Sequence, residues 1–226
     1  ATCKQIKSMD FTDVKITRKG DFHEEQLAKI IEQDKTLHEI ASVTMQEGGD
    51  RLKTLVFCPS VDAAEALCRM LNEGYDARAG WVCGDEKRVS KEDRAIVLDE
   101  FHTGDLNILV NVAVLTEGWD EPGVEHIVMA QPTASTPRYT QMIGRGTRPL
   151  PGVVDFPDST PESRKAAIAA SAKPSLRITD LVDASMRHRI ISSMDVLSGE
   201  LDASVIERAK ENILAGLGRA NIDAEA

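Results

Sequence analysis

Two arginines and a glutamine near the middle of the chain have the types and spacing to bind a phosphate group. Gln141, Arg145 and Arg148 stand at i, i+4 and i+7, with Gly144 and a second glycine between them. If a helix continues to Arg148, the three side chains form one polar stripe. A guanidinium stays charged, grips phosphate through two nitrogens, and can stabilise charge on a transferred phosphoryl group. The simpler alternative is a solvated arginine-rich helix end that complements the helix dipole.

A second candidate segment is Leu115–Pro122 (LTEGWDEP), which follows the most apolar run of the chain. Gly118 allows the backbone to approach a ligand closely. The carboxylate of Asp120 can accept hydrogen bonds from a ribose or hold an arginine. The alternative here is an ordinary turn between a strand and a loop that contains a glycine and an aspartate.

The elements that must position these segments alternate between strands and helices. Short apolar runs predict strands over 52–58, 76–83, 106–112, 124–130 and 176–182. Helical spacing and caps predict helices over 22–45, 61–71, 90–104 and 136–144, with Ser60 and Ser90 as caps. The strands are apolar on both faces, which predicts an α/β fold with a parallel sheet covered on both sides. Ligands of such folds bind beyond the carboxyl ends of the strands.

The remaining segments are less regular. Residues 151–175 are rich in proline, serine and alanine, which predicts a loop or insertion with one short helix. Amphipathic spacing predicts two further helices near 184–194 and 202–216. These helices can pack on the sheet or bind a partner in a multi-subunit complex.

Composition excludes several classes of protein. The 226 residues are 42% hydrophobic and 28% charged, and no apolar run of ~18 residues suitable for a membrane span occurs. The net charge is −10 and the sequence contains no basic block, which argues against nucleic-acid binding through bulk positive charge. The four cysteines form no C-x-x-C pair, and the start has neither an initiator methionine nor a secretory apolar region. We expect a cytoplasmic protein with free thiols and no metal cage, and the chain to be a piece of a longer one.

The run Asp99–His102 (DEFH) looks like the magnesium motif of a helicase's first motor domain. The chain contains no G-x-x-x-x-G-K-[ST] phosphate loop, so a magnesium carboxylate here has no triphosphate to serve. The cap at Ser90 and the stop at Gly104 favour a solvated helix instead.

Taken together, three ordered motifs make the chain resemble the second, C-terminal RecA-like motor domain of a superfamily 2 helicase of the DEAD/DEAH type, in the bacterial restriction and repair branch. We name them the motif IV segment (55–60, LVFCPS), the motif V segment (115–124, LTEGWDEPGV) and the motif VI segment (141–148, QMIGRGTR). The resemblance implies a three-layer RecA-like fold. It predicts a helical lead-in over 1–50, the RecA-like domain over 51–183 and a helical extension over 184–226.

The resemblance also implies roles for single residues. Arg145 and Arg148 would be catalytic, reaching the γ-phosphate of ATP as arginine fingers. The nucleotide would be lined by four further residues, Gln141, Gly118, Asp120 and Gly144. A DNA or RNA backbone would lie along Ser60, Gly84, Val112, Ala113 and Thr116. Many family members carry a Thr-Asp pair where this chain has Val112-Ala113, so these two positions offer no side-chain hydroxyl to a phosphate, and Thr116 is a weaker candidate for that contact.

The activity implied is that of an ATP-dependent helicase or translocase. ATP and Mg²⁺ would be held mainly by the first RecA-like domain, and this chain alone would be inactive. Expected partners are that first domain, DNA or RNA, and subunits of a restriction or repair complex. An alternative function, which the absent phosphate loop keeps open, is a non-catalytic RecA-like scaffold within a nucleic-acid-processing complex.

Overall fold

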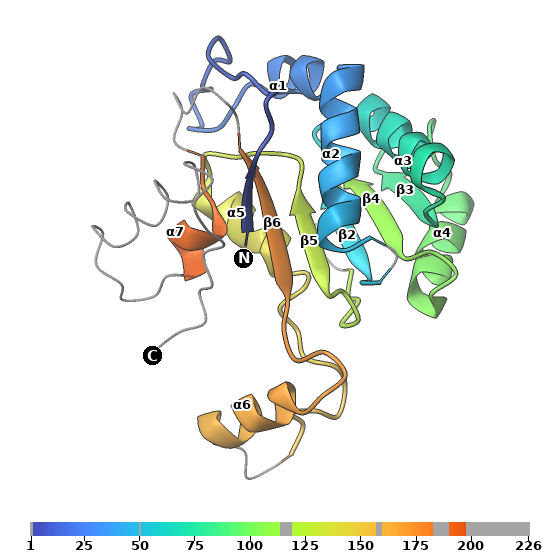
Figure 1. Cartoon of the computed structure of the whole chain (residues 1–226), viewed down its shortest axis with the longest axis vertical. Helices are drawn as coiled ribbons and strands as arrows, with labels where there is room; N and C mark the ends of the chain where they lie inside the picture. The colour runs from blue at the N-terminus through green and yellow to red at the C-terminus, as the bar shows by residue number, and fades with distance from the viewer. Residues whose placement is uncertain (1, 50, 114–118, 157–159, 183–189, 198–226) are drawn as a thin grey trace.

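The computed structural model describes residues 2–49, 51–113, 119–156, 160–182 and 190–197 (Figure 1). The strands are β1 (Thr2–Gln5), β2 (Thr54–Phe57), β3 (Ala79–Cys83), β4 (Ile108–Val112), β5 (His126–Met129) and β6 (Arg177–Val182). The described helices are α1 (Glu24–Ile31), α2 (Asp34–Glu47), α3 (Val61–Tyr75), α4 (Lys91–Thr103), α5 (Thr136–Ile143), α6 (Pro161–Ala169) and α7 (Ser193–Leu197).

The strands form one parallel sheet in the order β1-β6-β5-β2-β4-β3. The chain therefore leaves β4 on one side of β2 and enters β5 on the other side. The described part of the motif V segment, residues 119–124, lies in this crossover and leads into the amino end of β5. The α/β fold with a parallel sheet, predicted from the apolar strand runs, is confirmed.

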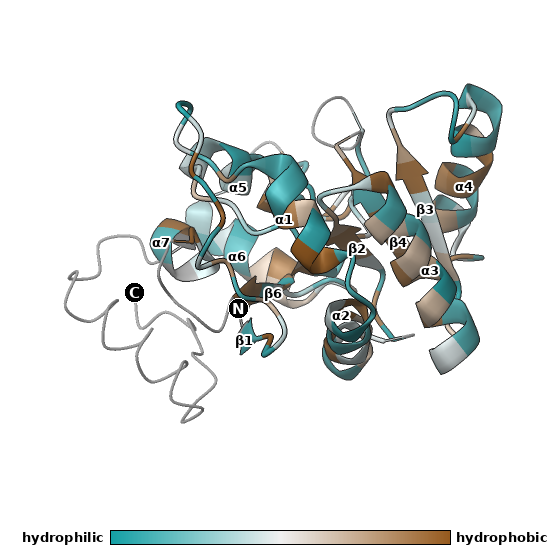
Figure 2. Cartoon of the chain, turned by 90° about the horizontal axis from the view of Figure 1, so that it is seen from above, coloured by the Kyte–Doolittle hydropathy of each residue, from teal (hydrophilic) through white to brown (hydrophobic). Residues whose placement is uncertain are grey.

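Helices cover both faces of the sheet, because successive strand residues point to opposite sides. In β2 and the residue after it, Val56 and Cys58 pack with α1, α2 and α3 in one buried cluster. Leu55 and Phe57 pack in a second cluster with Phe101 of α4 and the α5 side chains. Figure 1 shows the two helix layers, one on each face of the sheet. Figure 2 shows hydrophobic residues along the strands and on the helix faces turned towards them. The result is a three-layer structure with the sheet in the middle.

Serine caps begin two of the predicted helices. The Ser60 hydroxyl accepts from the Ala63 amide at 3.2 Å at the start of α3. The Ser90 hydroxyl accepts from the Asp93 amide at 3.0 Å at the start of α4. Asp99 lies within α4, so the helical interpretation of the DEFH run is confirmed.

Three helix boundaries differ from the prediction. The helix expected over 22–45 is two helices, because Gln33 is extended between α1 and α2. The helix α3 continues to Tyr75 and ends where Asp76 adopts the left-handed conformation with φ of 52°. Gly74 therefore lies inside α3. A helix was expected near 184–194, but residues 190–192 are non-helical and α7 begins at Ser193; residues 184–189 of that prediction lie outside the described residues.

Residues 1–50 contribute more than the helices expected there. The strand β1 pairs with β6 at the edge of the sheet, with Thr2 opposite Thr179 and Gln5 opposite Val182. The helices α1 and α2 supply Leu27, Ile31 and Ile40 to the first buried cluster. This lead-in is thus continuous with the sheet and its core.

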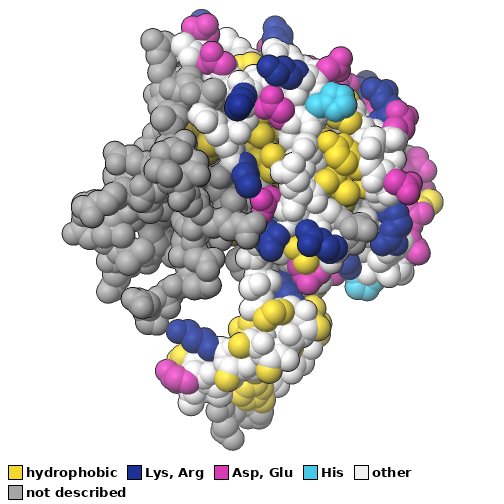
Figure 3. Space-filling model, viewed as in Figure 1, with side chains coloured by type: hydrophobic (Ala, Val, Ile, Leu, Met, Phe, Trp, Pro, Cys, Tyr) yellow, Lys and Arg dark blue, Asp and Glu magenta, His cyan; other side chains and the backbone are white. Residues whose placement is uncertain are grey.

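The insertion expected over 151–175 projects from the amino end of the sheet and carries α6 (Figure 1). Thr160 and Ser163 form a capping box at the start of α6, and no α6 side chain is buried. Figure 3 shows hydrophobic side chains on this projection, while basic and acidic groups are interspersed on the rest of the face shown. The second predicted C-terminal helix, near 202–216, lies outside the described residues. Within the described ranges, no helix has the length and apolar character needed to cross a bilayer.

Candidate functional site

The motif VI arginine Arg148 forms an ion pair with Asp120 of the motif V segment. Its Nη1 lies 2.5 Å from Asp120 Oδ2, and the two side chains are 58% and 49% exposed. The pair therefore lies at the surface, where a guanidinium can exchange its carboxylate for another anion. It brings together two of the residues that the sequence assigned to a nucleotide.

Arg145 contacts the same segment from a half-buried position. Its Nη1 donates to the Trp119 carbonyl at 2.6 Å, one residue before Asp120. The Trp119 ring packs beside Phe101 of α4, with centroids 6.2 Å apart. The motif V and motif VI segments are therefore joined at two consecutive positions, 119 and 120.

The single helical stripe expected for Gln141, Arg145 and Arg148 is wrong. The helix α5 ends at Ile143, and the next turn tightens, with the Arg145 and Gly146 amides donating three residues back to the carbonyls of Met142 and Ile143. Gln141 is exposed near the end of α5, and Gly144 follows it with helical φ of −55°. The tightened turn instead directs the motif VI backbone along the sheet.

Gly146 allows the motif VI backbone to lie directly on the sheet. A Cβ at this position would be 2.5 Å from Leu176 Cδ1 and 3.0 Å from Ile127 Cδ1. Ile127 is in the amino half of β5, and Leu176 immediately precedes β6. The arginine pair with Asp120 therefore lies towards the amino end of the sheet.

The residues assigned to nucleic acid lie at the opposite end of the sheet. Ser60 follows β2, Gly84 follows β3 and is exposed, and Val112 ends β4. Ala113 is exposed and has φ of 58°, a left-handed conformation that costs an alanine about 1–2 kcal/mol. Thr116 and Gly118 lie outside the described residues. The candidate site is thus two groups, one at each end of the strands.

The Ser60 hydroxyl is already engaged within the fold. Besides capping α3, it donates to Glu32 Oε1 at 2.6 Å. This contact joins the end of the motif IV segment to the residue after α1. A phosphate oxygen accepts hydrogen bonds, so a direct hydroxyl contact to a phosphate needs the Ser60 proton and would have to displace Glu32.

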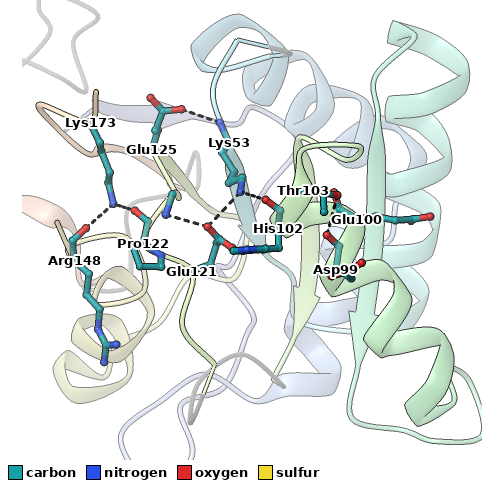
Figure 4. Close-up of polar contacts among 11 residues, drawn as sticks. Lys53, Asp99, Glu100, His102, Thr103, Glu121, Pro122, Glu125, Arg148 and Lys173 are labelled. Carbon is teal, nitrogen blue, oxygen red and sulfur yellow. Dashed lines mark hydrogen bonds and ion pairs between the residues drawn. The ribbon is translucent and has the colours of Figure 1, made fainter. Parts of the chain in front are cut away.

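Buried polar groups that sequence reasoning missed hold the motif V segment. Glu121 is 5% exposed and accepts from Lys53 Nζ at 3.2 Å, while its other oxygen is 2.7 Å from His102 Nδ1 (Figure 4). Lys173 is 6% exposed and contacts backbone carbonyls of both motif segments. No spacing signal indicated these residues, because their partners are distant in sequence.

A buried carboxylate anchors α5 behind the motif VI segment. The Tyr139 hydroxyl donates to Asp180 Oδ1 at 2.6 Å, and Ser193 donates to the other oxygen through its hydroxyl and its amide. Burial raises the pKa of Asp180, and these donors act in the opposite direction. The network ties α5, β6 and the start of α7 together.

The donor set at the amino end fits a phosphate group more closely than a cation. Two guanidinium groups converge on one segment, and the nearest exposed carboxylate, Asp120, is already paired with one of them. Across the described residues, no group of three or more metal-ligand side chains was found.

Comparison with known proteins identifies relatives of this arrangement. Residues 32–149, more than half of the chain, match the family model described as "Helicase conserved C-terminal domain". A Schizosaccharomyces pombe protein named as a mitochondrial ATP-dependent helicase, irc3, is 34% identical over 155 residues. That alignment covers 66% of this chain but only 25% of the relative's length.

Two solved structures share the fold. The C-terminal domain of the DEAD-box protein Dbp5 has a TM-score of 0.50 at 16% identity, covering 77% of this chain and 91% of that one. The Escherichia coli DEAD-box protein SrmB, solved with the regulator RraA, has a TM-score of 0.50 at 18% identity, covering 67% and 74% of the two chains.

Proposed function

Because the chain belongs to the helicase conserved C-terminal domain family, we propose that it is the second motor domain of an ATP-dependent helicase or translocase. In this proposal it supplies arginine fingers to an ATP site shared with a first RecA-like domain. The 226 residues contain no phosphate loop, so ATP and Mg²⁺ would be held mainly by that first domain. The chain spans about a quarter of the S. pombe relative, so the activity belongs to a longer protein.

The observation that carries the proposal is the exposed pair of Arg148 with Asp120, beside Arg145 on Trp119. An arginine finger must be charged, reachable from a neighbouring domain and free to change partner. Arg148 is charged and 58% exposed, and its partner is an exposed carboxylate. Surface pairs of this kind contribute about 0–1 kcal/mol, so exchange for a phosphate is inexpensive.

Each site residue then has a defined task. Bound ATP supplies the phosphoryl group that water accepts. Arg148 leaves Asp120 and stabilises the negative charge that develops on that group, with Arg145 beside it. Asp120, released from Arg148, accepts hydrogen bonds from the ribose, and Gly118 and Gly144 allow close backbone approach. Gln141 on the exposed end of α5 contacts the first domain and couples the nucleotide to closure of the cleft.

Nucleic acid would bind at the carboxyl end of the sheet. One strand of DNA or RNA would be contacted, mainly through backbone amides, by Ser60, Gly84, Val112, Ala113 and Thr116. The dispersed charge of the chain fits contacts of this kind rather than binding by a basic surface. The two groups of site residues lie at opposite ends of the β-sheet. Closure of the ATP cleft at one end would therefore move the bound nucleic acid at the other.

The test uses the intact protein that contains this chain. Arg148→Ala should lower the turnover number for nucleic-acid-stimulated ATP hydrolysis by about 10³-fold, with nucleotide affinity changed only a few-fold. Arg164→Ala, on the exposed surface of α6, is the matched control and should retain turnover. Wild-type turnover in Arg148→Ala would refute the arginine-finger role.

The alternative is a RecA-like scaffold without catalysis, for which the absent phosphate loop is the argument. A phosphate loop encoded upstream in the same reading frame supports the motor, whereas a native start near Ala1 supports the scaffold.

A cytoplasmic location also stays a prediction, since the S. pombe relative is named as mitochondrial. Cell fractionation decides it.

A further inference from the structure

Lys173, at the foot of the α6 projection, donates to three backbone carbonyls. Its Nζ lies 2.6 Å from the Pro122 oxygen, 2.8 Å from the Gly146 oxygen and 2.8 Å from the Arg148 oxygen. An ammonium has three N–H donors, so these contacts use all of them. The residue is 6% exposed, which makes it a buried cation without a hydrogen-bonded carboxylate among these contacts.

The three carbonyls belong to the two segments that form the candidate ATP site. Pro122 is two residues after Asp120, Gly146 follows Arg145, and the third carbonyl is that of Arg148 itself. Figure 4 shows the Lys173 ammonium between the carbonyls of Pro122 and Arg148, with the Arg148 side chain pointing away. One ammonium therefore fixes the separation of the motif V and motif VI backbones.

The other side of the motif V segment is also fixed. Lys53 Nζ and His102 Nδ1 hold the Glu121 carboxylate, and Glu121 Oε1 accepts from the Gly123 amide at 3.0 Å. The segment is thus held between the start of β2 and the α6 projection. Because Glu121 holds the motif V backbone in place, loss of the Lys173 contacts should change the distance between motif V and Arg148 more than it changes the course of the motif V backbone.

Burying this charge opposes folding, so the contacts must compensate. Burial lowers the pKa of Lys173, and the carboxylates of Glu125 and Glu121 act against that shift. An apolar side chain would avoid the cost of burying a charge. It would leave three carbonyls without their donor, and the two segments would separate to recover hydrogen bonds.

We propose that Lys173 is a positioning residue for phosphoryl transfer, which acts through the backbone on the position of Arg148 relative to the motif V segment. This proposal rests on the proposed function of Arg148. A misplacement of about 1 Å at a reacting centre can cost about 10²-fold in rate. Loss of Lys173 should therefore lower the rate of the chemical step and not the binding of nucleotide or nucleic acid.

The experiment compares Lys173→Met with Lys165→Met in the intact protein. Methionine matches the lysine stem without its donors, and Lys165 is an exposed lysine of α6. We expect Lys173→Met to lower kcat by about 10–100-fold with KM for ATP within about threefold, and Lys165→Met to behave as wild type. Rates are normalised to the fraction that binds a non-hydrolysable ATP analogue, so partial misfolding does not count as lost catalysis.

A double variant separates positioning from general stability. If Lys173 acts through Arg148, then Lys173→Met with Arg148→Ala should be no slower than Arg148→Ala alone. Fully multiplicative effects, wild-type kcat in Lys173→Met, or a raised KM with unchanged kcat each overturn the proposal. If Arg148→Ala itself keeps wild-type turnover, the proposed function fails first. If only Lys173→Met keeps it, the arginine-finger function survives and the positioning role fails.

Discussion

Arg148 and Asp120, 28 residues apart in the chain, join the motif VI and motif V segments through an ion pair of 2.5 Å at the surface. Both side chains are about half exposed, so solvent screens the pair and the net stabilisation is about 0–1 kcal/mol. The backbones on either side are held more firmly, by Lys173 and by the Lys53–Glu121 contact. The motif V and motif VI backbones are therefore held in place, whereas the Arg148 guanidinium can readily exchange Asp120 for another anion.

The first prediction concerns Asp120→Asn. The amide keeps a hydrogen-bond acceptor for the ribose but loses the charge that holds Arg148 in place before ATP binds, so we expect turnover of the intact protein to fall by about tenfold, less than for Arg148→Ala. The free energy of unfolding of this chain should change by less than about 0.5 kcal/mol. Steady-state ATPase rates and urea titrations measure the two effects. A larger rate loss than that of Arg148→Ala would contradict a supporting role for Asp120.

Much of the fold could be predicted because its signals are local. Apolar runs indicate strands that are buried on both faces. A serine just before a helical run indicates a helix start, and Ser60 and Ser90 both accept a backbone amide there. The strand β1 was missed because a four-residue edge strand, Thr-Cys-Lys-Gln, has little apolar pattern. Its position is decided by pairing with β6, which comes more than 170 residues later.

The site was predictable in its residues but not in its geometry. The spacing of Gln141, Arg145 and Arg148 indicates a helical stripe, yet α5 ends at Ile143 because the next turn packs on Ile127 and Leu176 through Gly146. Lys173 gave no signal, since its partners are carbonyl oxygens that every residue type carries. Only the tertiary fold brings those carbonyls together.

A second prediction separates the structural use of Ser60 from contact with nucleic acid. Ser60→Ala removes the α3 cap and the Glu32 contact, so the free energy of unfolding should fall by about 1–2 kcal/mol. Affinity of the intact protein for nucleic acid should fall less than about fivefold, because the backbone contacts remain. Ser90→Ala removes a cap at α4 without a Glu32 contact and is the matched control. Strong loss of affinity with unchanged stability would show that the hydroxyl itself binds the strand.

A third prediction concerns the chain on its own. Its sequence has neither a phosphate loop nor a basic block, so it should hydrolyse no ATP and bind single-stranded DNA or RNA only with a Kd of about 10⁻⁴ M or weaker at physiological salt. ATP turnover that is lost on Arg148→Ala would contradict the shared site. Fluorescence anisotropy across a salt series tests the second part, and tight binding with a steep salt slope would show a cationic surface that the charge distribution does not reveal.

The last prediction follows from a histidine buried in the middle of the sheet. His126 is fully buried in β5, with Nδ1 3.2 Å from the Thr54 hydroxyl and Nε2 2.9 Å from the Thr179 hydroxyl. Burial lowers the pKa of His126 to about 4, and the charge of Arg177 adds to the effect. Between pH 6.5 and about 4, the unfolded chain therefore binds a proton that the folded chain does not.

Stability must then fall as the pH is lowered through this window, and His126 should account for about 3 kcal/mol of the loss. Replacing it with glutamine removes the titrating group and keeps polar atoms near both threonines. Wild type is more stable than His126→Gln at neutral pH, and that difference should shrink by about 3 kcal/mol as the pH falls to about 4. His38→Gln on the exposed side of α2 controls for a general histidine effect and should leave the slope unchanged. A constant difference between wild type and His126→Gln, measured by urea unfolding at each pH, would mean that His126 titrates equally in the folded and unfolded chains.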